Sequence, residues 1–188
     1  MKRTKLNLHR LTTIGMFAAL IAILSPFAIP IGMVPITLGL FAVLLAATTL
    51  HPLDSVPAVA VYLGLGAIGL PVFSGGRGGA AVLVGPTGGY LWSYLLTALA
   101  VGLLVRLGIF GGKGGKFALL RGALACFIGV LICYALGTVQ YCFVTGTGWL
   151  AALPSCVLPF LPFDLVKCFA AAFFGRILRP IAERFGSR

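Results

Sequence analysis

Charged residues are scarce in this chain, and acidic residues are the scarcest. Only 9% of the 188 residues are charged, three are acidic, and 60% are hydrophobic. A water-soluble domain of this length would carry about 25% charged residues. The shortage therefore excludes an ordinary soluble domain and places the chain among membrane proteins.

Residues that bind metals or perform catalysis are also few. The two histidines, His9 and His51, lie far in sequence from the five cysteines, and no two cysteines form a C-x-x-C pair. Zinc and iron–sulfur sites need closely spaced ligands, and an odd number of cysteines does not suit a disulfide framework. Membrane hydrolases and transferases need clustered carboxylates or a nucleophile beside its base. The sequence shows neither pattern, so we expect no metal site and no enzyme activity.

The segment GGKGGK, residues 111–116, lacks two residues of a nucleotide-binding loop. The Walker pattern needs a glycine five positions before its Gly-Lys pair and a serine or threonine after the lysine. Phe110 and Phe117 occupy these positions. The segment therefore predicts a basic turn, and nothing here indicates that the chain hydrolyses ATP.

Long apolar runs, by contrast, are abundant. A helix needs about 20 residues to cross a hydrocarbon core of ~30 Å, and six stretches meet this requirement. They lie near residues 11–30, 33–50, 55–72, 87–108, 118–143 and 157–178. We therefore predict an all-α integral membrane protein, a single domain of six transmembrane helices over residues 1–188.

Basic residues gather on one side of the predicted membrane. Apart from Arg77 and Lys167, they flank the first span, the loop between the fourth and fifth spans, and the end of the sixth: Lys2, Arg3, Lys5, Arg10, Arg106, Lys113, Lys116, Arg121, Arg176, Arg179, Arg184 and Arg188. The positive-inside rule makes this side cytoplasmic, so both termini should be cytoplasmic. Nucleic-acid binding would need basic residues interleaved with aromatics on a solvated face, so the net charge of +11 does not indicate it.

Two opposite charges lie inside the sixth predicted span, in LPFDLVK (161–167). Asp164 and Lys167 are three residues apart, which puts them about 60° apart on one face of a helix. Charged groups within a membrane usually meet a partner or a cavity. Either the pair is a structural salt bridge, or it lines a polar pocket that receives a ligand. A solitary channel or proton-coupled carrier is a further, less favoured interpretation.

The connection between the third and fourth spans, residues 71–89, is rich in glycine. Its apolar centre, Ala80-Ala81-Val82-Leu83-Val84, suggests that it packs onto the helices. We interpret it as a lid or plug, with a flexible loop of no special role as the alternative. Ala18 and Ala22, four apart on the first span, would let another helix approach closely. Ordinary packing within the chain is the interpretation that the spacing alone favours.

Three segments together resemble one known family. GLPVF (69–73), GPTGGYL (85–91) and PFDLVK (162–167) are similar to the BioY family, the biotin-binding capture subunits of energy-coupling-factor (ECF) transporters. The resemblance implies a six-helix fold in the cell membrane that binds one vitamin near the outer face, with no cofactor of its own. It also implies docking through the Ala-x-x-x-Ala surface of Ala18 and Ala22 to a transmembrane coupling protein. Two cytoplasmic ATPases, the subunits that use ATP, would drive that partner.

The resemblance also suggests roles for individual residues. Asp164 would accept from the ureido N–H groups of biotin, and Lys167 would donate to a carbonyl or carboxylate. The motif residues expected at the site are Gly85, Thr87, Gly88, Gly89 and Tyr90, with the glycines allowing close approach of the backbone. Arg77 from the lid is a second candidate for the carboxylate. A different small vitamin remains the alternative ligand, and the cytoplasmic turn HPLDS (51–55) departs from the family's usual glycine and basic residue.

Overall fold

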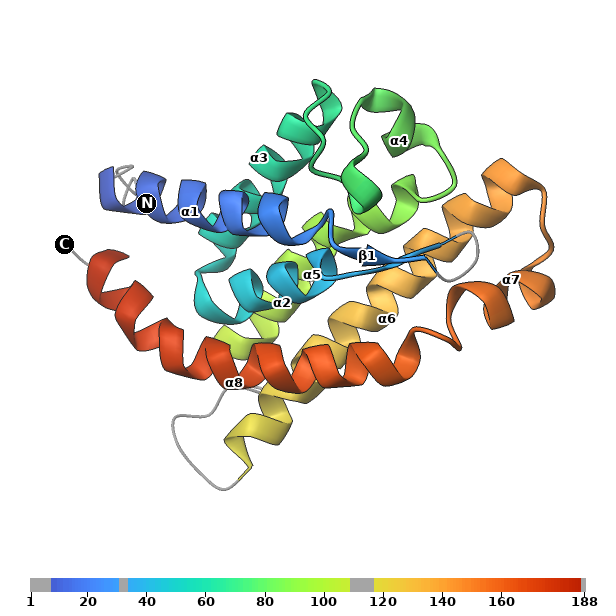
Figure 1. Cartoon of the computed structure of the whole chain (residues 1–188). Coiled ribbons are helices and arrows are strands. Elements are labelled where there is room, and N and C mark those ends of the chain that lie inside the picture. Colours follow the sequence, from blue (N-terminus) through green and yellow to red (C-terminus); the bar gives the residue numbers. More distant parts are fainter. Residues whose placement is uncertain (1–7, 31–33, 109–116, 187–188) are drawn as a thin grey trace.

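The computed structural model describes residues 8–30, 34–108 and 117–186. Within them lie eight α-helices, one short hairpin and one 3₁₀ turn (Figure 1). The helices are α1 (Leu8–Leu24), α2 (Gly39–Thr49), α3 (Pro52–Ala67), α4 (Ala80–Val84), α5 (Gly88–Arg106), α6 (Ala118–Thr145), α7 (Trp149–Cys156) and α8 (Leu161–Gly186). Strands β1 (Ala28–Ile29) and β2 (Ile36–Thr37) form the hairpin, and the 3₁₀ turn is Ser74–Gly76. The basic turn predicted at 111–116 lies outside the described residues, as do Lys2, Arg3, Lys5, Arg188 and the side chain of Arg184.

Helices α1, α2, α3, α5, α6 and α8 correspond to the six predicted spans, but the first two are shorter than predicted. Helix α1 ends at Leu24, because Pro26 disfavours helical geometry in the residue before it. The antiparallel pair of β1 and β2 fills the region where span one was expected to end and span two to begin. Helix α2 therefore starts only at Gly39 and has 11 residues, a length of about 17 Å.

Helix α2 lies at the centre of the bundle. Ala42, Val43, Leu44 and Ala46 are fully buried, so the helix is covered on all sides, chiefly by α5, α8 and α1. Glycines allow the closest of these approaches: a side chain at Gly175 on α8 would collide with Thr48 of α2. A helix that is apolar all round belongs in the interior of a bundle. Here its short length leaves space above its first residue.

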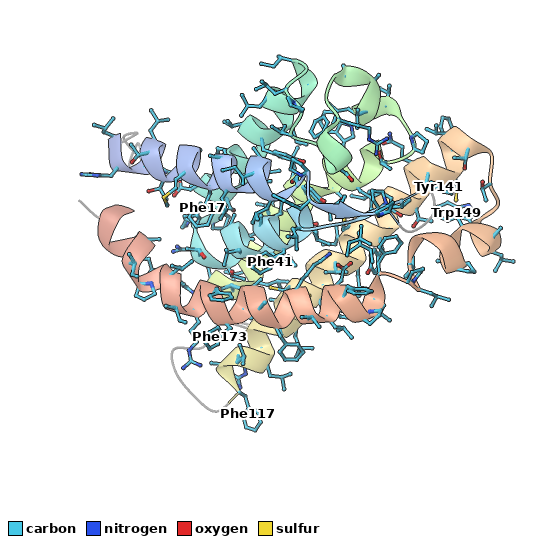
Figure 2. All side chains as sticks on the ribbon, viewed as in Figure 1. Phe17, Phe41, Phe117, Tyr141, Trp149 and Phe173 are labelled. Atoms are coloured by element: carbon cyan, nitrogen blue, oxygen red, sulfur yellow. The ribbon has the colours of Figure 1, made fainter. Side chains whose placement is uncertain are left out.

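The outer surface of the bundle is apolar. Figure 2 shows Phe117, Phe173 and Trp149 at the outside, and each is more than half exposed. Helices α5 and α6 are long and apolar enough to cross a membrane, and α1, α2 and α3 are shorter apolar helices. Side chains of this kind on an outer surface are expected where lipid, not water, is the surrounding solvent.

The start of α1 and the end of α8 lie at the same end of the bundle, which we call the terminal end (Figure 1). Ion pairs join its helices: Arg10 of α1 contacts Asp54 of α3, and Arg106 of α5 contacts Glu183 of α8 at 3.5 Å. In the turn between α2 and α3, Nδ1 of His51 accepts a hydrogen bond from the Leu53 N–H at 3.2 Å and so caps α3. Burial, together with the positive charge of Arg106, lowers the pKa of His51.

Candidate functional site

A cavity opens at the opposite end, which we call the cavity end. Its volume is about 620 Å³, including the space at its open mouth. Segments from five parts of the chain form its walls: Val34, Pro35, Ile36, Thr37 and Leu40 from the hairpin and the start of α2; Phe73, Ser74, Arg77 and Val82; Thr87, Tyr90, Leu91 and Tyr94; Cys133 and Tyr134; Phe160, Asp164 and Lys167. The cavity exists because α2 begins deep in the bundle, so the hairpin and α4 enclose the space that a longer helix would fill.

A buried ion pair lies in the wall of this cavity. Nζ of Lys167 donates to Oδ1 of Asp164 at 2.7 Å, and the hydroxyl of Tyr134, on α6, donates to Oδ2 at 2.6 Å. Asp164 is only 3% exposed. Each of the two interpretations of LPFDLVK describes part of the structure: Asp164 and Lys167 form a salt bridge with each other, and both also line a cavity.

The local sequence explains how this pair is held. Helix α8 begins at Leu161, and Pro162 suits its first turn, where the missing N–H needs no partner. Asp164 lies in the same turn, where the positive end of the helix dipole stabilises a carboxylate. Lys167 follows one turn later, so its flexible stem reaches back to Asp164 along the helix surface.

The predicted motif residues divide into two groups. Thr87, Tyr90 and Arg77 line the cavity. Gly85, Gly88 and Gly89 are not among the lining residues; Gly85 is half-buried, whereas Gly88 and Gly89 are buried: a side chain at Gly88 would collide with the Leu83 carbonyl, and one at Gly89 would lie 2.6 Å from the Leu136 carbonyl oxygen of α6. Gly88 and Gly89 therefore allow one part of the protein to pack closely against another.

The glycine-rich connection is held against the helices at Leu83, which is buried, while Val84 at its apolar centre is 71% exposed. The side-chain amide of Gln140, on α6, donates to the carbonyls of Leu83 and Gly85 at 3.0 and 2.9 Å, and the Trp92 indole donates to Leu83 at 3.2 Å. Phe73 is fully buried and meets Tyr62 edge to face. Hydrogen bonds from two helices thus hold α4 in place as part of the cavity wall.

Sequence reasoning missed the contribution of the hairpin and of Tyr134. The hairpin residues lay inside the predicted ends of two spans, and no motif marked them. Tyr134 did carry a readable signal, because a tyrosine hydroxyl inside a membrane span needs a hydrogen-bond partner. The few polar side chains in the neighbouring spans, Asp164 among them, were the available partners.

The small residues of α1 fall on two different faces. Ala18 is 1% exposed and lies in the core, and Ala22 is half-buried. Gly15 and Ala19, also four residues apart, are exposed. The exposed small-residue face of α1 is therefore rotated from the one that the sequence suggested, and Ala18 packs within the chain.

An apolar helical bundle with a largely apolar cavity, lined at a few positions by charged and hydroxyl groups, is typical of a class: membrane proteins that bind a small molecule near one face. Comparison with known proteins gives the family, because residues 1–184 match the BioY family model. The chain belongs to the BioY family.

Curated relatives and a solved structure agree with this assignment. The chain is 40% identical to the biotin transporter BioY2 of Lactococcus lactis subsp. cremoris, over 95% of this chain and 93% of that one. It is 38% identical to the biotin transporter BioY of Thermotoga maritima, with 93% and 98% covered. The crystal structure of the S-component for biotin from an ECF-type ABC transporter has a TM-score of 0.81, 32% identity, and coverage of 91% and 90%. The predicted class, an all-α membrane fold of the S-component type, is confirmed.

Proposed function

We propose that this chain is the biotin-capture subunit, or S component, of an ECF-type uptake transporter. It is a transport protein that binds its ligand without a chemical step and needs no cofactor of its own. The observation that carries the proposal is the buried Asp164–Lys167 pair in the wall of a cavity that is otherwise largely apolar. Such a cavity suits a small ligand with an apolar body and a few polar groups at fixed positions.

The charges of the cavity suit a ligand with a single negative charge. Asp164, Lys167 and Arg77 are the charged residues that line it, which leaves one positive charge in excess. Biotin offers one carboxylate, an apolar thioether ring and chain, and a ureido group with two N–H donors and one carbonyl. Each of these parts has a counterpart in the cavity wall.

The two cations have different partners, and this suggests an orientation for biotin. Lys167 is engaged by Asp164, whereas the described residues give Arg77 only the Ser74 carbonyl, at 3.2 Å, and no acidic partner. We assign the carboxylate of biotin to Arg77. The ureido ring then lies against the buried pair, where Asp164 accepts from an N–H group and Lys167 donates to the carbonyl.

The remaining assignments concern the assembly. The subunit lies in the cell membrane with the terminal end in the cytoplasm, because the positive-inside rule assigns the side of the basic flanking segments to the cytoplasm, and Arg10, Arg106 and Arg179 lie at that end. It works with a transmembrane coupling protein and two cytoplasmic ATPases, which supply the energy. The docking face was predicted at Ala18 and Ala22, and the exposure of Gly15 and Ala19 favours those two residues as its centre.

Titration calorimetry of the purified chain with biotin tests the proposal. Biotin should bind in the nanomolar range, about −12 kcal/mol, while riboflavin and thiamine should bind at least a thousandfold more weakly. Tighter binding of either of those vitamins would reject the assignment of biotin. Substrate uptake by vesicles that contain this chain alone, with no ATPase present, would instead support a solitary carrier.

A further inference from the structure

Among the described residues, the hydroxyl of Tyr134 gives the buried pair a hydrogen bond from a different helix. Tyr134 lies on α6, 30 residues before Asp164, and donates to Oδ2 at 2.6 Å from a buried position. A short hydrogen bond from a phenol to an ionised carboxylate is among the stronger hydrogen bonds in proteins. Tyr134 also lines the cavity, so its ring lies beside the space that a ligand would occupy.

The two donors to Asp164 restrain the carboxylate to different degrees. Rotation about the terminal torsion of an aspartate is soft. Lys167 has a flexible stem on the same helix, so its ammonium can follow the carboxylate as it turns. The tyrosine ring has only two side-chain torsions and is packed on α6, so it cannot follow. Tyr134 therefore fixes the plane in which the two carboxylate oxygens lie.

Fixing this plane determines what the carboxylate can accept. An ionised carboxylate has about four acceptor positions, two on each oxygen. Lys167 occupies one on Oδ1 and Tyr134 occupies one on Oδ2. The positions that remain can accept N–H groups, and their directions are set by the protein before the ligand arrives.

We propose that Tyr134 is a positioning residue that aims Asp164 at a ureido N–H group and thereby sets the selectivity of the site for hydrogen-bond donors on the ligand. This inference rests on the proposed binding of biotin. Removing the hydroxyl should leave the cavity intact and the carboxylate present, but turned out of its plane.

A double-mutant cycle with biotin as the probe tests the inference. We expect Tyr134→Phe to weaken biotin binding about tenfold in the native chain, and less than about twofold in the Asp164→Asn background, because the amide no longer offers the tyrosine a carboxylate. Tyr141→Phe is the matched control: Tyr141 is on the same helix, two turns away, and is buried outside the cavity lining. Equal losses in both backgrounds, or an equal loss in the control, would overturn the inference.

Ligand analogues supply a second measurement, in which a replacement donor at position 134 separates the loss of a hydrogen bond from general loosening of the structure. Biotin methylated at one or the other ureido nitrogen lacks one donor, and the native chain should bind at least one of these analogues tenfold or more weakly than biotin. Tyr134→Phe should reduce this ratio to less than threefold, and 4-aminophenylalanine at position 134, which restores a donor, should recover most of it. An unchanged ratio in Tyr134→Phe overturns the inference, while a native chain that binds no biotin refutes the proposed function itself.

Discussion

Asp164 is an acidic side chain within an apolar bundle, and its surroundings make it an acceptor that a ligand can use. A charge in such a place needs compensation, which Lys167 and Tyr134 provide with one hydrogen bond to each oxygen. The sequence predicted the ionic half of this arrangement, because residues three apart on a helix share a face. It did not predict the tyrosine, because contact between α6 and α8 depends on how the whole bundle packs.

Replacement of Asp164 by asparagine should weaken biotin binding at least tenfold, about 1.4 kcal/mol. The amide keeps the shape of the side chain but lacks the charge that Lys167 and the ureido N–H group require. Asp54→Asn is the matched control, since Asp54 forms its ion pair with Arg10 at the terminal end. Calorimetry should show its affinity within twofold of the native value, and an equal loss in both variants would contradict the assignment.

His51 should make stability depend on pH. The pKa of this imidazole is lowered in the folded chain, so the unfolded chain binds the proton more readily. The stabilising contribution is therefore complete above the unfolded pKa of about 6.5 and is lost as the pH falls below it. Protonation also removes the Nδ1 acceptor that caps α3.

Thermal unfolding in detergent at pH 8 and pH 5 measures this effect. The native chain should have a slightly lower Tm at pH 5 than at pH 8. His51→Asn keeps a capping oxygen without titrating, so it should show a smaller difference between the two pH values. A larger loss in this variant than in the native chain would contradict the role of His51.

At the scale of elements, the long helices were predictable and the short ones were not. Six apolar runs of membrane length left few alternatives for α5, α6 and α8. The hairpin, α4 and α7 were missed because two to eight residues carry too little periodicity to be recognised, although residues of the hairpin and of α4 line the cavity. The interpretation of residues 71–89 as a lid stays a prediction, while the structure shows α4 fastened by Gln140 and Trp92.

Gln140→Leu should loosen α4 while the charged residues of the cavity stay in place. The substitution leaves the Leu83 and Gly85 carbonyls without their amide donor, which should cost about 1–3 kcal/mol of stability. Hydrogen exchange followed by mass spectrometry should show faster exchange over residues 78–88. Val139→Leu, a change at an exposed apolar position next to it, serves as the control. Exchange as slow as in the control would mean that the α5 contacts alone hold α4.

At the scale of the whole molecule, the two ends of the bundle carry different sets of functional residues. The cavity end carries the proposed ligand site with its Asp164–Lys167 pair, and the terminal end carries the ion pairs of Asp54 and Glu183. The exposed face of α1 is available for a partner along the length between them. Substitutions on this face should therefore affect assembly without changing the affinity for biotin.

Gly15→Leu and Ala19→Leu together should abolish co-purification with the coupling protein while biotin affinity stays within twofold. Larger side chains on this exposed face would block the close approach of a partner helix. Ala18→Leu gives the contrast, because a larger side chain in the core should destabilise the chain itself by about 1–3 kcal/mol. If Ala18→Leu alone abolished co-purification with no loss of Tm, the docking face would be the one first predicted from the sequence.

The position of the short helix α2 bears on how a bound ligand leaves the cavity. Below the cavity, fully buried residues of α2, among them Val43 and Leu44, fill the centre of the bundle. In the described part of the chain, a ligand in the cavity would therefore have packed protein below it. We expect release on the opposite side of the membrane to require a movement of the subunit as a whole.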